Sequence, residues 1–419
     1  MHDFSNRVRK ARLLLAVASS VAFAACGQSL VPNSAPQALA PFAAPATGYK
    51  KLYSFTGYPA GAKPTGLSFF SGVLYGTASN GGAHTFGAVF ARTASGGART
   101  VYSFAGGLDG ATPTGGLTGL GGLLYGTTEE GGSHGDGTVF RVNTDGAENV
   151  VHAFSGGTDG AAPILGTLLE VGSALYGATS AGGASNCHFQ GSVGCGTIYS
   201  LNAQGAEHVL HRFTGKPDGA APYGTLIAVN GTLYGTTAFG GKYDNGCVFS
   251  LSTSGALHVI YSFKGFPDGA EPWAGVVSLN GKLYGTTAFG GAFDYSGTVY
   301  SLTLSGTERV LHSFSGYPDG AVPYDGLAAV DNTLYGTTQF GGESGQRCTG
   351  KGLEGCGIVF SITPSGTESV IYRFKGDPDG SIPWSPLLAR GRTLYGTTVS
   401  GGRKGEGSIF SISAGAASR

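Results

Sequence analysis

The feature that most constrains the fold is the string Leu-Tyr-Gly, which recurs seven times along the chain. Its tyrosines are spaced by 50, 51, 58, 50, 51 and 60 residues, and they are Tyr75, Tyr125, Tyr176, Tyr234, Tyr284, Tyr335 and Tyr395. A period of about 50 residues matches the blades of a β-propeller better than the shorter units of most solenoids. The spacing therefore predicts seven blades.

Each repeat contains four short runs of β-branched and aromatic residues, bounded by Gly, Asn, Asp and Pro. In the fifth repeat these runs are residues 276–279, 283–287, 297–302 and 308–314, and Asn280-Gly281 makes a hairpin signal between the first two. Four antiparallel strands per repeat is what a propeller blade requires. The predicted fold is all-β.

The two ends of the repeat region predict how the ring closes. Residues 51–55 form a fourth strand with no blade before it, and residues 408–412 form a third strand with no fourth strand after it. The N-terminal strand can therefore complete the last blade, which removes the exposed edges of an open array. We expect Tyr53 to lie alongside Ile409.

Composition excludes several other classes of protein. The chain has 419 residues, of which 77 are glycine and 18 are proline, and 41% are hydrophobic. So many glycines disfavour long helices, and the hydrophobic content is too high for a disordered chain. The 25 basic and 25 acidic residues cancel, and no dense basic run follows residue 12, so nucleic acid is not an expected partner.

The first 50 residues predict export. A basic cluster ending at Arg12 precedes the apolar run 13–25, which is too short to span a bilayer and is typical of a signal peptide (1–25). Cys26 follows Phe23-Ala24-Ala25, which resembles a bacterial lipobox except that Phe stands where Leu is usual. We expect Cys26 to be lipidated, with ordinary cleavage and an incidental cysteine as the alternative. Residues 26–50 are rich in Pro and Ala and form the predicted tether, and the propeller spans 51–415.

The ordered strings within each repeat resemble those of a known family. Leu-Tyr-Gly-Thr-Thr, Gly-Gly, Gly-Thr-Val-Phe, Ser-Phe and Pro-Asp-Gly-Ala occur in this order over residues 51–412. The pattern resembles the GloVer tandem-repeat family of bacterial exported proteins, and only loosely that of kelch propellers. The resemblance implies an exported repeat protein and no established activity.

Two sets of loops are predicted to share one face of the ring. One set joins the fourth strand to the next blade and contains Asp-Gly-Ala-x-Pro, and the other joins the second strand to the third and contains Gly-Gly. Two Gly-Gly loops are longer and contain the pairs Cys187/Cys195 and Cys348/Cys356, which predict two disulfides in an exported protein. A metal site formed by Cys187, His188 and Cys195 is the alternative for the first pair. Cys247 replaces a strand threonine and is expected to be buried.

Aromatic residues recur on the same two sets of loops. The candidate ligand-binding residues are Tyr223, Trp273, Tyr324 and Trp384, after the proline, and Phe239, Phe289 and Phe340, before Gly-Gly. Aromatic faces around a rim can stack on sugar rings. Packing between blades is the alternative, and the pattern alone favours it.

Repeated aspartates and histidines are interpreted as structural. Six copies of Asp-Gly suit tight turns, with calcium binding as the alternative. His152, His211 and His312 alternate with tyrosine at one strand position, which favours packing over metal ligation. The non-repeated acids on these loops could support acid–base chemistry, and they are Asp136, Asp244, Asp294, Glu343 and Glu354.

Together these observations predict a binding or scaffold module for a glycan or an envelope protein. It contains no P-loop, metalloprotease or hydrolase-elbow motif, no catalytic residue is assigned, and no cofactor or metal is expected, calcium excepted. Membrane association is expected only through the lipid anchor. The rival hypothesis is a polysaccharide hydrolase or lyase with carboxylates at the channel mouth. A purely structural surface protein is the third.

Overall fold

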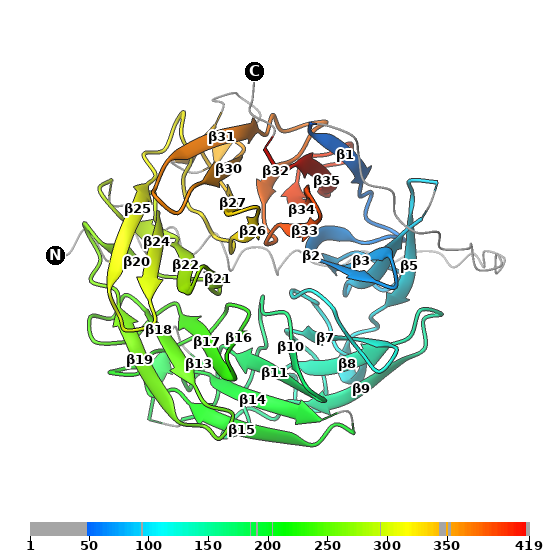
Figure 1. Ribbon diagram of the computed structural model, residues 1–419. Coiled ribbons are helices and arrows are strands. Elements are labelled where there is room, and N and C mark those ends of the chain that lie inside the picture. Colours follow the sequence, from blue (N-terminus) through cyan, green and yellow to red (C-terminus); the bar gives the residue numbers. More distant parts are fainter. Residues whose placement is uncertain are drawn as a thin grey trace. The chain divides into compact units, whose positions relative to one another are not determined.

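The fold is a closed ring of seven antiparallel sheets (Figure 1). The computed structural model describes residues 48–415, except 94, 185, 190–191, 203, 294, 343–348 and 351–352. The predicted signal peptide, Cys26, and most of the predicted tether lie outside these residues. The seven blades of four strands confirm the predicted fold.

The first four blades follow one another in sequence. Their strands are β2 (Ala62–Phe70), β3 (Val73–Asn80), β4 (Ala88–Arg92) and β5 (Ala98–Ser103); β6 (Thr118–Leu120), β7 (Leu123–Thr128), β8 (Thr138–Val142) and β9 (Glu148–Ala153); β10 (Leu169–Val171), β11 (Ala174–Thr179), β14 (Thr197–Asn202) and β15 (Glu207–Arg212); and β16 (Ile227–Val229), β17 (Thr232–Thr237), β18 (Cys247–Leu251) and β19 (Leu257–Ser262).

The remaining three blades complete the ring. Their strands are β21 (Val277–Leu279), β22 (Lys282–Thr287), β24 (Thr298–Thr303) and β25 (Glu308–Ser313); β26 (Ala328–Val330), β27 (Thr333–Thr338), β30 (Ile358–Ile362) and β31 (Glu368–Arg373); and β33 (Leu388–Arg390), β34 (Thr393–Ser400), β35 (Ser408–Ser413) and β1 (Lys50–Ser54), with β32 (Ser381–Pro383) also on β34.

Several short elements lie within the loops that connect the blade strands. They are a 3-10 turn at Gly107–Asp109 and three two-stranded pairs, β12 (His188–Phe189) with β13 (Ser192–Val193), β20 (Gly269–Ala270) with β23 (Phe289–Gly290), and β28 (Thr349–Gly350) with β29 (Leu353–Glu354). The part of the chain that the structure describes contains no helix with the length and hydropathy needed to cross a membrane.

The first strand of a blade lies nearest the centre and the fourth lies at the periphery, as β16 and β19 show in Figure 1. Threonine side chains link neighbouring blades near the centre. Thr236 Oγ1 donates to the Ala274 carbonyl at 2.8 Å, and Thr286 Oγ1 donates to the Asp325 carbonyl at 2.9 Å. Thr77 Oγ1 likewise donates to the Gly115 carbonyl at 2.7 Å, so the second residue after Leu-Tyr bridges to the next blade in three of the seven repeats.

The N-terminal strand closes the ring as predicted. β1 pairs antiparallel with β35, and Tyr53 lies opposite Ile409. The Phe55 amide extends this pairing by donating to the Gly407 carbonyl at 2.9 Å. Tyr49 seals the outer edge, since its ring stacks on that of Tyr372 with a centroid distance of 3.8 Å and an interplanar angle of 6°.

Aromatic pairs form the core between blades. The phenylalanine that follows each fourth strand is fully buried, and its ring meets the aromatic ring of the next blade's third strand at centroid distances of 5.0 to 5.4 Å. These phenylalanines are Phe55, Phe104, Phe154, Phe213, Phe263, Phe314 and Phe374. The contact at Phe55 is equivalent to the other six, so the seam is packed like an internal blade boundary.

The glycine of Leu-Tyr-Gly makes room for that third-strand ring. A Cβ atom on Gly235 would lie 2.6 Å from Phe249 Cζ and 2.7 Å from a methyl carbon of Leu226. Such distances are far inside van der Waals contact. The repeated string therefore records a packing requirement.

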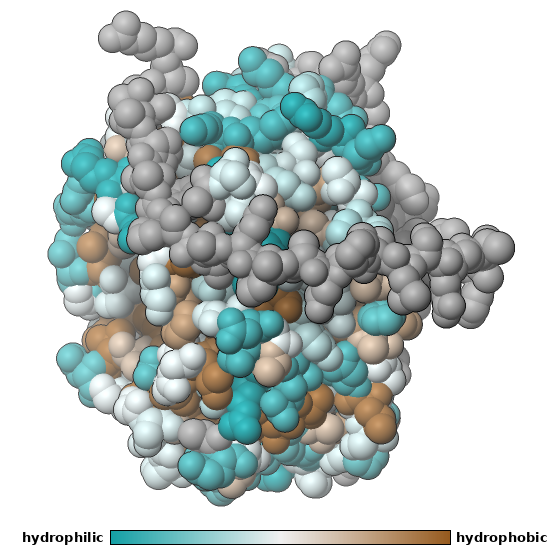
Figure 2. Space-filling view, turned by 90° about the vertical axis from the view of Figure 1, so that its right-hand side faces the viewer, coloured by the Kyte–Doolittle hydropathy of each residue, from teal (hydrophilic) through white to brown (hydrophobic). Residues whose placement is uncertain are grey.

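The outer side of the ring carries hydrophobic residues scattered among hydrophilic ones, with no single continuous hydrophobic patch on the side that Figure 2 shows. Isolated apolar residues are ordinary on a protein surface.

Candidate ligand-binding face

The two sets of loops meet on one face of the ring, as predicted, and we call this the loop face. Short backbone bridges join each Asp-Gly-Ala connection to the Gly-Gly loop of the blade it enters. Examples are Ala220 with Phe239, Ala270 with Phe289 and Ala321 with Phe340. Because both partners are loops, this face depends on these contacts for its shape.

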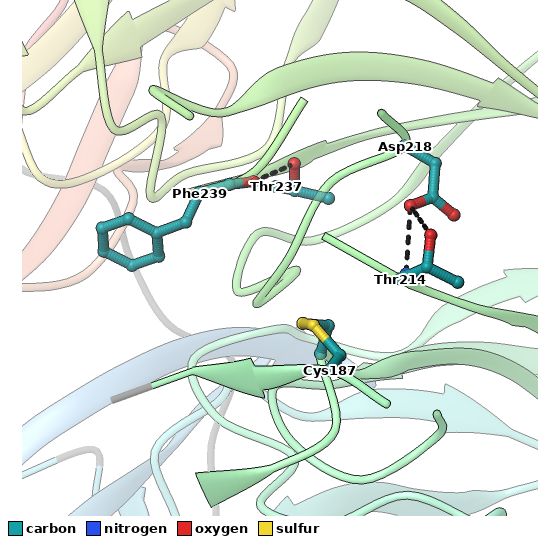
Figure 3. The surroundings of a disulfide bond; sticks show 6 residues. Cys187, Thr214, Asp218, Thr237 and Phe239 are labelled. Carbon is teal, nitrogen blue, oxygen red and sulfur yellow. Dashed lines mark hydrogen bonds between the residues drawn. A yellow bond between two sulfur atoms is a disulfide. The ribbon is translucent and has the colours of Figure 1, made fainter. Parts of the chain in front are cut away.

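The six repeated aspartates hold the connection loops together. Each carboxylate accepts a hydrogen bond from the backbone amide four residues earlier, at 2.5 to 3.2 Å; the donors are Ala105, Ser155, Thr214, Lys264, Ser315 and Lys375. Figure 3 shows this arrangement at Asp218, which accepts from both the amide and the hydroxyl of Thr214. The geometry matches the turn role expected from the sequence.

A disulfide joins Cys187 to Cys195 in the long Gly-Gly loop of the third blade (Figure 3). The Cα atoms are 5.7 Å apart, and the disulfide confirms that prediction over the metal alternative. The Cys195 carbonyl accepts the Ala221 amide at 2.9 Å, which links the loop to the connection into blade four. Cys356 is buried, and its predicted partner Cys348 lies outside the described residues. Cys247 is buried, as expected, and forms no disulfide, and its thiol donates to the Asp218 carbonyl at 3.3 Å.

Four of the predicted ligand-binding aromatics form a row at the centre. Tyr223 stacks on Trp273 at 4.4 Å, Trp273 on Tyr324 at 4.9 Å, and Tyr324 meets Trp384 at 5.0 Å with a tilt of 32°. Phe239 meets the Trp273 ring edge-on at 5.7 Å. The faces that stack within this row are occupied by neighbouring rings.

The row therefore combines packing with limited exposure. The rings of Tyr223, Trp273 and Tyr324 are 5 to 8% exposed, whereas Trp384 is only partly buried. Phe289 and Phe340 are also partly buried, and they pack against the same central cluster. What these residues can offer a ligand is their edges and the outermost ring of the row.

Three acidic residues that were not singled out in the sequence act electrostatically on Tyr324. Glu129, Glu271 and Asp325 all act electrostatically on its hydroxyl, raising its pKa together with burial, which is the main cause. Burial also raises the pKa of Asp325 and of Glu129 to about 7, and Glu130 adds to the effect on Glu129. Asp325 stands where other repeats have Gly, Ala or Ser, and this single departure was the signal available in the sequence.

Two buried polar atoms in this region lack a hydrogen-bond partner among the described residues. They are the Tyr324 hydroxyl and Gln339 Nε2. The acids singled out from the sequence lie elsewhere on the Gly-Gly loops. Asp136 is partly buried, Glu354 is exposed, and exposed Asp244 pairs with Lys216 at 3.6 Å. Asp294 and Glu343 fall outside the described residues.

Exposed large hydrophobic side chains concentrate on the loop face. Among the described residues eleven are exposed, and all but Val150 and Leu304 belong to the two sets of loops. The nine are Tyr58, Phe86, Leu108, Val193, Tyr243, Phe266, Phe293, Tyr295 and Tyr317. They were missed in the sequence because most stand at positions that vary between repeats.

The repeats match one described family. The Gloeobacter/Verrucomicrobia repeat matches residues 40–189 and 187–351, which together cover well over half of the chain. The chain belongs to this family. The matched residues contain the first five blades and the start of the sixth, and the match confirms the resemblance seen in the sequence. No curated protein matches.

Several solved structures resemble this family member in fold alone. A surface component of the type-IX secretion system of Porphyromonas gingivalis, PorZ, is 15% identical with a TM-score of 0.52, covering 87% of this chain and 48% of that chain. A putative 6-phosphogluconolactonase from Bacteroides uniformis is 17% identical with a TM-score of 0.49, covering 77% and 88%. A gluconolactonase from Xanthomonas campestris is 14% identical with a TM-score of 0.40, covering 68% and 85%.

Proposed function

We propose that the protein is an exported glycan-binding module whose ligand contacts the loop face. The observation that supports this is the placement of nine of the eleven exposed large hydrophobic residues on that face. Exposed hydrophobic residues that gather on one surface mark interaction sites more often than residues scattered over a whole molecule.

The chemistry of these residues favours a glycan over a protein partner. Seven of the nine are Tyr or Phe, whose rings stack on the apolar faces of sugars. They are distributed among loops of several blades, whereas a protein interface needs a contiguous desolvated core. Similar rings repeated around a face also suit a polymer, because each additional contact raises the effective concentration of the next.

The central row supplies a rigid base and part of the contact. Tyr223, Trp273 and Tyr324 hold the loops by stacking, and we propose that Trp384, Phe289 and Phe340 contribute their exposed edges.

Placement at the cell surface belongs to the same proposal. The disulfide between Cys187 and Cys195 is consistent with export. We propose that Cys26 carries a lipid anchor, which labelling with a fatty acid tests by comparing the full chain with Cys26→Ser. Equal labelling of the two chains would disprove the anchor.

Binding to polysaccharides tests the main proposal. The probes are insoluble cellulose, chitin, xylan and peptidoglycan in pull-down assays, followed by titration with soluble oligomers of the polymer that binds. The variant Tyr58→Ser/Phe266→Ser/Tyr317→Ser removes three exposed rings, and Val150→Ser/Leu304→Ser is the matched control outside the loop face. We expect the first variant to bind the polymer with at least tenfold lower affinity than the wild type and the second variant to bind it with unchanged affinity. Equal binding by all three proteins, or no binding to any probe, would refute the proposal.

An enzyme is the second candidate because Glu129, Glu271 and Asp325 all act electrostatically on Tyr324. A carboxylic acid with a pKa near 7 can serve as a general acid at neutral pH. Release of reducing sugars from the same polymers, abolished by Asp325→Asn, would favour this function over simple binding.

A further inference from the structure

A cluster of three side chains recurs at the outer edge of the ring, where two blades meet. A tyrosine or histidine from one blade's fourth strand faces the aspartate of the connection, and the first residue of the next blade's fourth strand completes the cluster. In two of these clusters the three residues are histidine, aspartate and glutamate, namely His152, Asp159 and Glu207, and His312, Asp319 and Glu368.

The geometry of the first cluster is that of an incomplete coordination shell. One ligand atom from each of His152, Asp159 and Glu207 lies within 4.8 Å of the other two. His152 Nε2 is 3.3 Å from Asp159 Oδ1, while Asp159 Oδ2 accepts from the Ser155 amide and hydroxyl. The backbone turn thus fixes the aspartate and directs its second oxygen at the histidine.

Two atoms of this cluster are buried without a hydrogen-bond partner among the described residues. They are His152 Nε2 and Glu207 Oε1. Neither atom contacts solvent. His152 Nε2 has the Asp159 carboxylate at 3.3 Å as its polar neighbour, and Glu207 Oε1 is a buried acceptor of the kind that a protein normally pairs.

Neighbouring groups leave the cluster accessible. Arg212 partly offsets the negative charge at Glu207, but its Nε donates to the Thr158 carbonyl at 2.8 Å. An open pocket of about 370 Å³ lies beside the cluster and is lined by Thr158, Asp159, Glu207, His208, Val209 and Arg212. Water could therefore reach the remaining coordination positions.

The second cluster repeats this arrangement half a ring away. His312 Nε2 is 3.1 Å from Asp319 Oδ2, which also accepts the Ser315 amide at 3.1 Å. Glu368 Oε1 is again buried without a partner among the described residues, and Arg373 occupies the place of Arg212.

We propose that each His–Asp–Glu cluster binds a divalent transition metal ion, with Zn²⁺ as the reference case, and that the ion joins the outer strands of two adjacent blades. One imidazole and two carboxylates with open positions for water form an accepted ligand set for such ions. Metal–ligand distances near 2 Å place the donor atoms about 3.5 Å apart in a tetrahedral site. Small side-chain rotations would close the present separations to that value.

Equivalent positions at other blade boundaries lack at least one of the three proposed ligands, and we expect no metal there. Tyr102 and Tyr261 donate their hydroxyls to Asp109 and Asp268, at 2.7 and 2.8 Å, so a phenol takes the place of the imidazole. His211 pairs with Asp218 at 2.9 Å, but Leu257 stands where the glutamate would be. The chain itself thus shows that tyrosine can stand in place of the histidine, and leucine in place of the glutamate, at equivalent positions of the fold.

Metal titration of the tag-free full chain tests the proposal. After treatment with EDTA and its removal, Zn²⁺ binding is measured at pH 7.5 by calorimetry and by metal analysis after dialysis. We expect two ions per wild-type chain, one for His152→Tyr or Glu207→Leu, and none for His152→Tyr/His312→Tyr. Loss of a direct ligand should weaken its site by at least about 100-fold, beyond the 10 to 100-fold effect typical of groups behind the ligands.

The matched control is His211→Tyr, which should still bind two ions. Wild-type protein should also gain thermal stability in Zn²⁺ while the double variant should not, because an ion held only by the folded ring stabilises it. Each replacement copies a residue from an equivalent position, so the variants should fold, and circular dichroism checks this. Fewer than one ion bound by wild type, or two ions bound by the folded double variant, would overturn the proposal.

Discussion

Replacing Phe55 by alanine tests whether the seam of the ring is as strong as an internal blade boundary. Phe55 follows the N-terminal strand, is fully buried, and meets Phe90 at a centroid distance of 5.0 Å. Phe154 is its equivalent between blades two and three, also fully buried, and meets Tyr199 at 5.1 Å. The two positions differ in chain connectivity and hardly at all in packing.

The expected magnitude follows from burial. Removing about 150 Å² of aromatic surface at about 25 cal/mol/Å² costs about 4 kcal/mol. This agrees with the range of about 3 to 5 kcal/mol for Phe→Ala in protein cores. If β1 is a full member of the last blade, Phe55→Ala and Phe154→Ala should lower the free energy of unfolding equally, to within about 1 kcal/mol.

Urea denaturation followed by circular dichroism and tryptophan fluorescence measures both variants, with Phe55→Leu and Phe154→Leu as milder controls. A loss below about 1 kcal/mol for Phe55→Ala, beside about 4 kcal/mol for Phe154→Ala, would show that β1 detaches easily. The closed-ring argument would then fail.

Three further predictions concern other features of the ring. Replacing both Cys187 and Cys195 by alanine should lower the free energy of unfolding by about 2.5 kcal/mol, from the loop-closure entropy of an eight-residue separation, in urea denaturation without reductant; unchanged stability would contradict it. Gly235→Ala should lower the free energy of unfolding by about 1 to 3 kcal/mol, because the added methyl group would overpack against Phe249. Gly326→Ala, whose Cβ would make only ordinary contacts, should lower it by less than about 0.5 kcal/mol. Equal losses in the two variants would disprove the packing role of Gly235. Burial and a neighbouring aspartate raise the folded-state pKa of Glu148 and Glu308 to about 7, so their contribution to stability is complete below pH about 4.5 and is lost as the pH rises through 7. The thermal midpoint in EDTA should therefore fall between pH 5 and pH 8, and Glu148→Gln/Glu308→Gln should flatten the profile; an unchanged slope would count against this cause.

The ring could be predicted from the sequence because the repeated residues make the same structural contacts in successive blades. Gly235 lies beneath a third-strand ring, Thr236 bridges to the next blade, and Asp218 caps its turn. The close packing at the glycine and the aspartate turn recur in most blades, so these residue types recur at a fixed spacing and reveal the architecture. The meeting of two loop sets on one face followed from strand alternation alone.

The candidate sites were harder to predict because they lie where the repeats differ. Asp325 and Glu129 occupy positions that hold small or other residues in neighbouring repeats, and only the ring brings them near Tyr324. The two His–Asp–Glu clusters each combine residues of two blades. The sequence pattern at His152 alone therefore favoured packing, and the fold is needed to bring Glu207 beside it. Side-chain pairing across a blade boundary has no local spacing signal.

The pairing of Lys50 with Ser411 means that the first and last strands of the fold are some 360 residues apart in the chain and share one sheet. During synthesis from the N-terminus, β1 is made before β35. Its backbone hydrogen-bonding groups therefore stay unpaired until the final strand has been made. Contacts of such long range form late and slowly. The ring therefore closes only when β35 is present. A product truncated before Ser408 would leave the edges of β1 and β34 unpaired, and such edges promote aggregation.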